Sequence, residues 1–177
     1  MNLIIVDFQN DFVNGSLAVP GAETARDNII TFIGNNFPNI HNIFFTVDNH
    51  PENHCSFIEN GGKWPRHCVS FTKGVAIDEK LYDFCRQQFI PCIKPKGENP
   101  NKEEYASNIL VDDPVVCGLA GDYCVKETII HMIENGYNPK VFYDGIASID
   151  GGITLDNYIK TYDLVCVNIN NRDYKLC

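Results

Sequence analysis

Residues 118–124, with the sequence GLAGDYC, place a cysteine directly after a glycine-containing turn. The segment lies between an apolar run ending at Cys117 and an apolar-periodic stretch that predicts a helix, with Asp122 as its N-cap. Cys124 would then lie in the first helical turn, where free N–H groups and the helix dipole lower a thiol pKa and bind an oxyanion. Cys124 is therefore a candidate nucleophile; the alternative is a cysteine that packs beneath the turn.

A thiol nucleophile needs a proton acceptor, and the best candidate is a carboxylate. Asp7 ends the apolar run 3–6, where burial would raise its pKa and allow it to move protons. Lys96, within KPKG at 94–97, could pair with that carboxylate. The alternatives are a cap that starts a loop for Asp7 and a solvated surface charge for Lys96.

A second cluster has the residue types of a metal site. Asp48 and His50 are two apart after an apolar run, and His67 follows in the same long connection. One carboxylate and two imidazoles suit zinc, iron or manganese. His54 could be a fourth ligand or a supporting group, and a polar loop with surface histidines is the alternative for the whole cluster.

The elements that must position these residues follow from hydrophobic periodicity. Short apolar runs rich in β-branched residues predict buried strands at 3–6, 43–47, 115–117, 140–143 and 164–167, with a weaker one at 90–93. Apolar residues four apart favour helices at 22–36, 78–88 and 124–135. The pattern predicts a single-domain α/β fold over residues 1–177, with about six mainly parallel strands and helices on both faces.

In such a sheet the site lies beyond the carboxyl ends of the strands. Asp7, Asp48, Lys96 and residues 118–124 all close or follow predicted strands. We therefore expect these four segments to meet at one edge of the sheet.

Composition limits the function classes. The 177 residues include 14 Lys plus Arg against 23 Asp plus Glu, a formal net charge of -9, which disfavours binding to nucleic acid or anionic membranes. No apolar run is long enough to cross a bilayer and no signal-peptide core precedes Asp7, so we expect a cytoplasmic protein. The eight cysteines are expected to be reduced thiols, and the sequence leaves a homo-oligomer open.

Taken together, the motifs resemble those of the isochorismatase-like cysteine hydrolases, and within them the nicotinamidases. The resemblance rests on IIVDFQNDF at 4–12 with GSLAVPGA at 15–22, on 48–57, on WPRHCV at 64–69, on 96–97 and on 118–125. These blocks span essentially the whole chain. The resemblance implies a Rossmann-like three-layer fold and a catalytic triad of Asp7, Lys96 and Cys124.

The resemblance also implies one divalent transition metal, with zinc as the first choice and iron or manganese as alternatives. Asp48, His50 and His67 would hold it, with His54 as a further ligand or a supporting residue. Isochorismatases proper do not use the cysteine, and carbamoyl-amide hydrolases of this fold generally lack the metal set. Both features are present in this chain.

The implied substrate is nicotinamide, with its pyridine nitrogen on the metal and its carboxamide over Cys124. A cis peptide ahead of Ala120 would direct the N–H groups of Ala120 and Cys124 toward the carbonyl oxygen as an oxyanion hole. Attack by Cys124 would give a thioester, which water activated by Asp7 would release as nicotinate. The alternatives are hydrolysis of another small amide or carbamoyl compound, and a non-catalytic member that binds a partner protein.

The ring of the substrate would pack against aromatic side chains at Phe12, Trp64 and Tyr105, although each could instead anchor the core or a loop. Three positions depart from the family pattern. Asn49 stands where an aromatic residue is usual, Gly121 where threonine is common, and Asn108 where phenylalanine is frequent. These differences concern the shape of the pocket more than the reaction class.

Overall fold

Within residues 1–176, the range that the computed structural model describes, seven strands form one sheet in the order β3-β2-β1-β4-β5-β6-β7. Neighbouring strands are parallel from β3 to β6, and β7 pairs antiparallel with β6. The strands are β1 (Asn2–Val6), β2 (Asn42–Asp48), β3 (Cys92–Lys96), β4 (Pro114–Leu119), β5 (Lys140–Ala147), β6 (Cys166–Val167) and β7 (Asp173–Tyr174). The predicted α/β class is confirmed.

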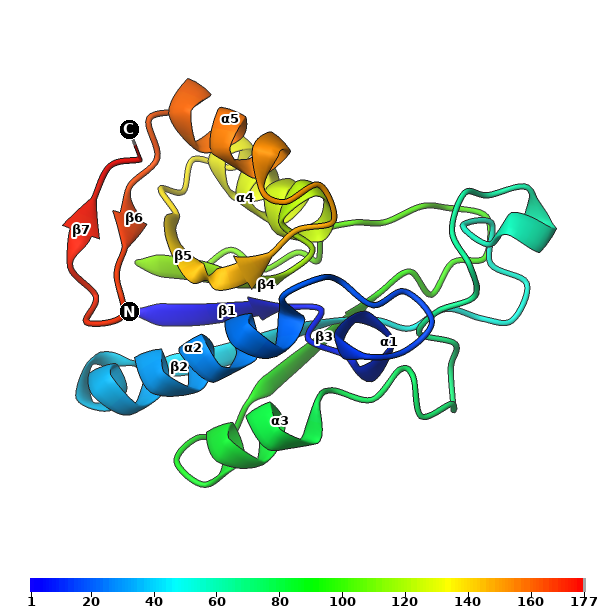
Figure 1. The fold of residues 1–177 in the computed structure, drawn as a ribbon, viewed down its shortest axis with the longest axis horizontal. Coiled ribbons are helices and arrows are strands. Elements are labelled where there is room, and N and C mark those ends of the chain that lie inside the picture. The colour runs from blue at the N-terminus through cyan, green and yellow to red at the C-terminus, as the bar shows by residue number, and fades with distance from the viewer. Residues whose placement is uncertain (177) are drawn as a thin grey trace.

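The helices are α1 (Asn10–Val13), α2 (Ala22–Asn36), α3 (Glu79–Arg86), α4 (Lys126–Glu134) and α5 (Ile153–Thr161). Two 3-10 turns, η1 (Phe37–Asn39) and η2 (Ile58–Asn60), and a π-helical turn, η3 (Gly121–Val125), complete the described elements. Figure 1 shows α2 and α3 on one side of the sheet and α4 and α5 on the other.

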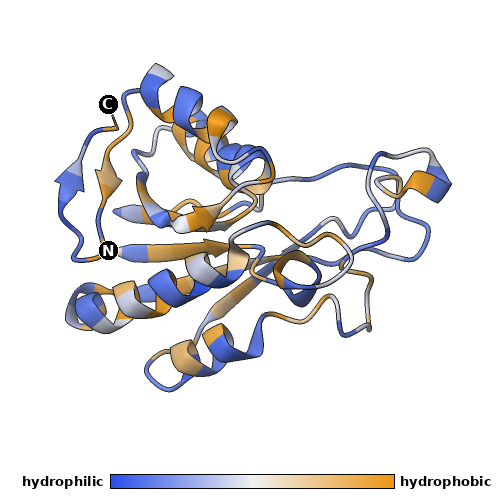
Figure 2. Cartoon of the chain, in the orientation of Figure 1, coloured by the Kyte–Doolittle hydropathy of each residue, from blue (hydrophilic) through white to orange (hydrophobic). Residues whose placement is uncertain are grey.

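The alternation of side chains along β1 explains the three layers. Leu3 and Ile5 pack into the core on the α2 side, whereas Ile4 and Val6 pack into the core on the α4 side. A strand buried on both faces must be apolar at every position, which is why it is a continuous hydrophobic run in the sequence. Figure 2 shows the resulting pattern, with hydrophobic strands inside and hydrophilic outer helix faces.

The third strand lies further along the chain than predicted. The sequence favoured 90–93, but β3 is Cys92–Lys96, and Ile90 is fully exposed. The strand includes Pro95, which cannot donate a ladder hydrogen bond. Pro95 is tolerated because β3 lies at the edge of the sheet.

The helix that follows β4 also begins differently. A π-helical turn over Gly121–Val125 comes first, and α4 starts only at Lys126. The prediction that Asp122 caps this helix is wrong, because its carboxylate instead accepts hydrogen bonds from the backbone N–H groups of Ile149 and Asp150 at 3.0 and 3.2 Å. Asp122 therefore ties the β4–α4 turn to the connection after β5.

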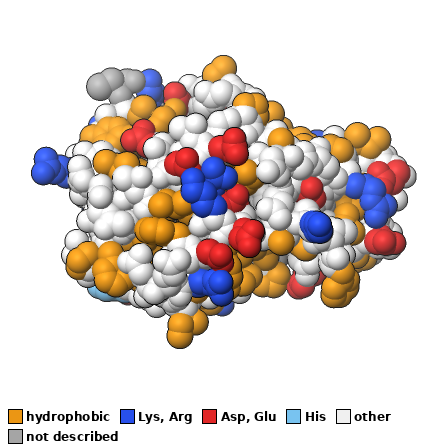
Figure 3. Space-filling view, turned by 60° about the horizontal axis from the view of Figure 1, so that its bottom comes forward, with side chains coloured by type: hydrophobic (Ala, Val, Ile, Leu, Met, Phe, Trp, Pro, Cys, Tyr) orange, Lys and Arg blue, Asp and Glu red, His pale blue; other side chains and the backbone are white. Residues whose placement is uncertain are grey.

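The structure also bears on the expectations about membrane spans, cysteines and surface charge. No helix within residues 1–176 is long and apolar enough to cross a bilayer. The seven cysteines of this range are free thiols, while Cys177 lies outside the described residues. Figure 3 shows basic and acidic side chains close together on one face, as expected for pairs such as Lys80 and Asp27, whose atoms lie 2.8 Å apart.

Candidate active site

The four predicted segments meet at the carboxyl edge of the sheet. Asp7 directly follows β1 with a left-handed backbone (φ 47°), Asp48 ends β2 and Lys96 ends β3. Cys124 lies in the turn after β4. Because β1, β2 and β3 are parallel and adjacent, their carboxyl ends bring these side chains together.

Lys96 lies at the centre of this group. Its Nζ is 2.8 Å from Asp7 Oδ2 and 3.6 Å from Cys124 Sγ, and it also contacts Asp48 Oδ1. All four side chains are buried. The candidate nucleophile, the candidate base and the candidate cation are thus within direct reach of one another.

The charges in this group shift one another's pKa values. Burial raises the pKa of Asp7 above its usual value, although the nearby Lys96 ammonium opposes the shift. For Asp48, burial acts in the same sense, but Lys96 and His50 outweigh it and hold the pKa well below its usual range. Burial alone would lower the pKa of Lys96, but Asp48 and Asp7 raise it, so Lys96 remains an ammonium.

The thiol does not behave as the sequence suggested. Burial raises the pKa of Cys124 well above its usual value; Asp7 and Asp48 add to this, and Lys96 opposes it. The expectation of a lowered pKa came from the helix dipole, but a π-helical turn precedes α4 and carboxylates surround the sulfur. Cys124 is therefore a neutral thiol that must give up its proton to react.

Two buried residues that the sequence analysis did not single out hold the carboxylates in place. Thr46 donates its hydroxyl hydrogen to Asp7 Oδ1 at 2.6 Å. The side-chain amide of Gln9 pairs with the backbone of Asp48, donating to its carbonyl at 2.7 Å and accepting from its N–H at 2.8 Å. An amide that contacts only backbone leaves no spacing pattern in a sequence, although Gln9 lies two residues from Asp7.

Asp48, His50 and His67 form a compact set of metal-ligand atoms, all within 4.8 Å of one another. The Nδ1 atoms of the two histidines pair with backbone carbonyls, at 3.0 Å to Gly97 and at 2.8 Å to Pro65. Each Nε2 faces Asp48 Oδ2, at 3.5 Å for His50 and 4.0 Å for His67. Carbonyls that fix the tautomer and leave Nε2 free are typical of histidine metal ligands, so these residues fit a transition metal.

His54 lies next to this set but its ring nitrogens have other partners. Its Nδ1 pairs with Ser56 Oγ at 2.7 Å and its Nε2 with the Lys102 carbonyl at 3.1 Å. Its ring packs against that of His50, with centroids 4.1 Å apart. In the described arrangement His54 packs against His50, and the compact donor set consists of Asp48, His50 and His67.

A pocket opens over Cys124 and reaches the edge of the metal set. The three aromatic residues expected to wall a substrate ring, Phe12, Trp64 and Tyr105, all line it, together with Asp48, His67 and Ala120. The pocket is also lined by four residues that the sequence motifs did not indicate: Leu17, Val19, Tyr123 and Ile149. Tyr123 could have been found from its position beside Cys124, whereas Ile149 is remote in sequence.

The aromatic wall is internally connected. Trp64 Nε1 donates to the Tyr105 hydroxyl at 3.3 Å, and the Trp64 ring meets Tyr123 edge to face, with centroids 4.9 Å apart. Ala120 follows a cis peptide bond from Leu119, as the family resemblance implied.

The three positions that depart from the family pattern have local explanations. The Asn49 side chain donates to Glu98 and accepts from Ser70, so it is part of a loop network. A Cβ at Gly121 would lie 2.1 Å from Ser148 Oγ, so a larger residue would not fit without movement. Asn108 pairs with His131 at 3.2 Å and does not line the pocket.

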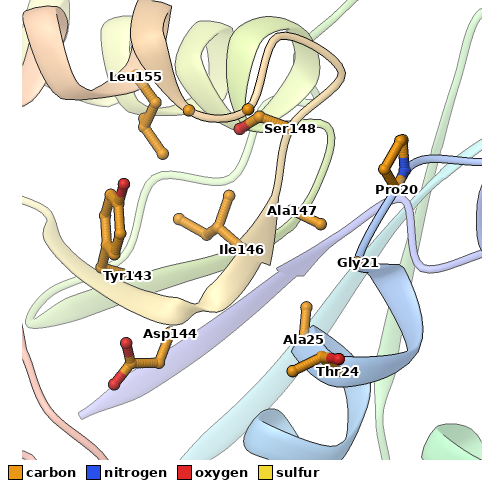
Figure 4. A pocket seen from close by; sticks show the side chains of 12 residues that line it. Pro20, Gly21, Thr24, Ala25, Tyr143, Asp144, Ile146, Ala147, Ser148 and Leu155 are labelled. Carbon is orange, nitrogen blue, oxygen red and sulfur yellow. The ribbon is translucent and has the colours of Figure 1, made fainter.

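A larger hollow lies elsewhere, between the start of α2, β5 and the start of α5 (Figure 4). Its volume is about 350 Å³, and it is lined by Pro20, Gly21, Thr24, Ala25, Tyr143, Asp144, Ile146, Ala147, Ser148, Gly151, Gly152 and Leu155. None of the predicted site residues lines it. We name it the α2–α5 hollow.

The fold and the buried Asp7–Lys96–Cys124 group define an α/β protein with a candidate thiol nucleophile. A model of the isochorismatase domain matches residues 1–163, so the chain belongs to the isochorismatase family. The family predicted from the motifs is confirmed, and with it the hydrolase class.

Individual relatives give the same result. The chain is 29% identical to the nicotinamidase of Escherichia coli strain K12, over 84% of this chain and 83% of that protein. Its structure resembles the pyrazinamidase of Pyrococcus horikoshii in complex with zinc, with a TM-score of 0.79, 30% identity, and coverage of 94% of this chain and 98% of that one. It also resembles PnC1 of L. infantum in complex with nicotinate, with a TM-score of 0.80, 28% identity, and coverage of 94% and 91%.

Proposed function

We propose that this protein hydrolyses nicotinamide to nicotinate and ammonia, with Cys124 as the nucleophile and a divalent metal beside it. The observation that carries the proposal is the Lys96 ammonium, which lies 2.8 Å from Asp7 and 3.6 Å from the Cys124 sulfur. The similarity to a nicotinamidase, a zinc-bound pyrazinamidase and a nicotinate complex supports the substrate class.

Asp7 is well placed to accept the thiol proton. Thr46 donates a hydrogen bond to Asp7 Oδ1. Asp7 Oδ2 forms the ion pair with Lys96 but has no well-aligned hydrogen-bond donor within the described residues. Burial raises its pKa, and a more basic carboxylate is a better proton acceptor near neutral pH. Lys96 remains charged beside both groups and stabilises the negative charge that moves between them.

In the first half of the reaction, the Cys124 sulfur bonds to the amide carbon as its proton passes to Asp7. The carbonyl oxygen becomes negative and accepts hydrogen bonds from the Ala120 and Cys124 N–H groups. Asp7 then gives the proton to the amide nitrogen, the carbon–nitrogen bond breaks, and ammonia leaves. The product of this half is a thioester on Cys124.

In the second half, Asp7 takes a proton from water as the water oxygen bonds to the thioester carbon. The carbon–sulfur bond breaks and the proton returns to the Cys124 sulfur, which restores the neutral thiol. The acid product ionises to nicotinate.

The substrate ring would lie against Phe12, Trp64 and Tyr105, which line the pocket over Cys124. Asp48, His50 and His67 would hold the metal, with zinc as the first candidate and iron or manganese as alternatives. When bound, the metal would supply a Lewis acid that orients the pyridine nitrogen. The direct chemistry on the amide stays with Cys124 and Asp7.

The central experiment measures ammonia release from nicotinamide, pyrazinamide and a panel of unrelated small amides. We expect nicotinamide and pyrazinamide to react at least about tenfold faster, in kcat/KM, than amides without an aromatic ring nitrogen. Equal rates across the panel would favour a general small-amide hydrolase. No release from any amide would favour a non-catalytic binding protein and would overturn the proposal.

A separate experiment tests the metal. Elemental analysis of the purified protein should find about one transition metal per chain, and the His50→Ala, His67→Ala double variant should lose it. A chelator should reduce ammonia release from the parent protein. A metal-free preparation with full activity would contradict the metal assignment while leaving Cys124 in its role.

A further inference from the structure

Lys63 places a positive charge against the aromatic wall of the pocket. The residue is exposed and directly precedes Trp64. Its Nζ lies 5.0 Å from the ring centroid of Trp64, 5.0 Å from that of Tyr123 and 5.9 Å from that of Tyr105. These distances are within the range of cation–π attraction. All three rings line the pocket that holds Cys124.

The other cations near the pocket are already paired. Lys96 is matched by the carboxylates of Asp7 and Asp48. Arg66, three residues after Lys63, pairs with Glu59 at 3.1 Å. Among the ion pairs of residues 1–176, none involves Lys63 within 4.0 Å, so its charge is not cancelled by direct contact.

One acidic group acts on the same wall from another side. Burial raises the pKa of the Tyr105 hydroxyl, the charge of Glu103 adds to this, and Lys63 opposes it. Both charges therefore reach Tyr105. Only Lys63 also contacts the faces of Trp64 and Tyr123.

We propose that Lys63 is a charge-selecting residue. Its positive charge strengthens the binding of aromatic carboxylates in this pocket more than it strengthens the binding of the matching neutral amides. The inference rests on the proposed function, in which a neutral amide becomes an anion in this pocket. Lys63 then acts mainly on the product. It raises the affinity for the carboxylate and so sets how strongly the product inhibits the enzyme.

The test uses the single tryptophan of the chain, Trp64, whose fluorescence reports ligand binding beside Lys63. Nicotinate and nicotinamide are titrated into the metal-containing Cys124→Ala protein, which cannot turn the amide over, at low and at high salt. The same titrations are made with Lys63→Met, which keeps the side-chain length, and with Lys63→Arg, which keeps the charge. Lys160→Met in α5 is the matched control, because Lys160 is exposed and away from the pocket.

We expect Lys63→Met to weaken nicotinate binding about fivefold and to remove most of its salt dependence, while nicotinamide binding changes by less than about twofold. Lys63→Arg and Lys160→Met should retain the parent ratio of the two affinities. Replacement of Lys63 changes the starting fluorescence of Trp64, so the affinity is taken from the midpoint of each titration and not from its amplitude.

Two results would overturn the proposal. If both ligands weaken equally in Lys63→Met, Lys63 only shapes the aromatic wall, and if neither changes, its charge does not reach the ligand. The proposed function fails separately, because that failure is the absence of ammonia release by the parent protein. If the parent protein hydrolyses nicotinamide but Lys63→Met leaves the ratio of the two affinities unchanged, only the proposed role of Lys63 is overturned.

Discussion

The connection between β5 and α5 contributes to both the candidate active site, through Ile149, and the α2–α5 hollow, through Ser148 and Gly151. The hollow is the larger of the two, at about 350 Å³, yet its carboxylate, Asp144, is exposed and forms no ion pair within residues 1–176. The smaller pocket lies over Asp48 and Cys124, with Lys96 and Asp7 beside them, all buried. Buried, mutually shifted charges therefore identify the reactive region better than volume does.

The largest expected difference between the two regions is catalytic. Cys124→Ala should reduce ammonia release from nicotinamide by at least about 10³-fold, because no other group replaces the nucleophile. Ser148→Ala in the α2–α5 hollow should leave the rate within about twofold. Steady-state kinetics, with circular dichroism to confirm folding, measures both. Residual activity of Cys124→Ala near the parent rate would remove Cys124 from the mechanism.

The next largest expected difference between the two regions is in the free energy of unfolding. Lys96→Met leaves Asp7 and Asp48 buried without their cation, which should cost about 3–5 kcal/mol in the free energy of unfolding. Without Lys96, burial should raise the pKa of Asp7 further above its unfolded value, so Asp7 favours folding only when protonated. This contribution to the stability of the variant should therefore be present at low pH and be lost as pH rises through the folded pKa of Asp7.

Chemical denaturation of the metal-free proteins at acidic and neutral pH measures this effect. Asp144→Asn in the α2–α5 hollow is the matched control and should change the unfolding free energy by less than about 0.5 kcal/mol. A Lys96→Met protein that is as stable as its parent at neutral pH would show that the buried charges do not depend on the lysine.

A glycine in each region tests the metal set. Gly97 has a φ of 70°, and a Cβ there would lie 2.4 Å from Cε1 of His50. Gly97→Ala should displace that ring and weaken metal binding about 10- to 100-fold, measured by competition with a chromogenic chelator. Gly151 in the α2–α5 hollow has nearly the same φ, 72°, but no neighbour within 4 Å of its Cβ position. Gly151→Ala should carry only the backbone strain, and equal metal loss in the two variants would contradict the role of the His50 contact.

The smallest expected effect concerns Tyr143, which lines the α2–α5 hollow. Tyr143 donates its hydroxyl hydrogen to Asp156 Oδ1 at 2.6 Å. Tyr143→Phe should cost about 1–2 kcal/mol of unfolding free energy, because the acceptor is charged, and leave nicotinamide turnover unchanged. Thermal unfolding and ammonia release measure the two effects. A marked loss of turnover at full stability would mean that the two regions are coupled.

The parts of the fold that could be predicted are those where one residue type is required at every position. β1 is buried on both faces, so it is a continuous run of apolar residues. The strand, and the position of Asp7 at its end, could therefore be predicted from the sequence. The edge strand β3 has alternating exposure and contains Pro95, so its signal was weak and its position was displaced. α5 was missed although Leu155 and Ile159, both buried, are four apart.

The site was partly predictable for the same reason. Strand ends fix the positions of Asp7, Asp48 and Lys96, but burial depends on segments far apart in the sequence, so the direction of the Cys124 pKa shift could not be predicted from it. The partners of Asp122, Ile149 and Asp150, are likewise remote in sequence. The local pattern predicted that Asp122 caps a helix, but its side chain forms tertiary hydrogen bonds instead.

The hydrogen bonds of the Asp122 carboxylate allow motion near the nucleophile to be followed by NMR. It lies two residues before Cys124 and accepts the amide hydrogens of Ile149 and Asp150, while Asp150 in turn accepts those of Gly152 and Thr154 at the start of α5. In a ¹H–¹⁵N spectrum, hydrogen exchange at the Ile149 and Asp150 amides would report on opening of the turn that carries the sulfur, without any label placed in the pocket.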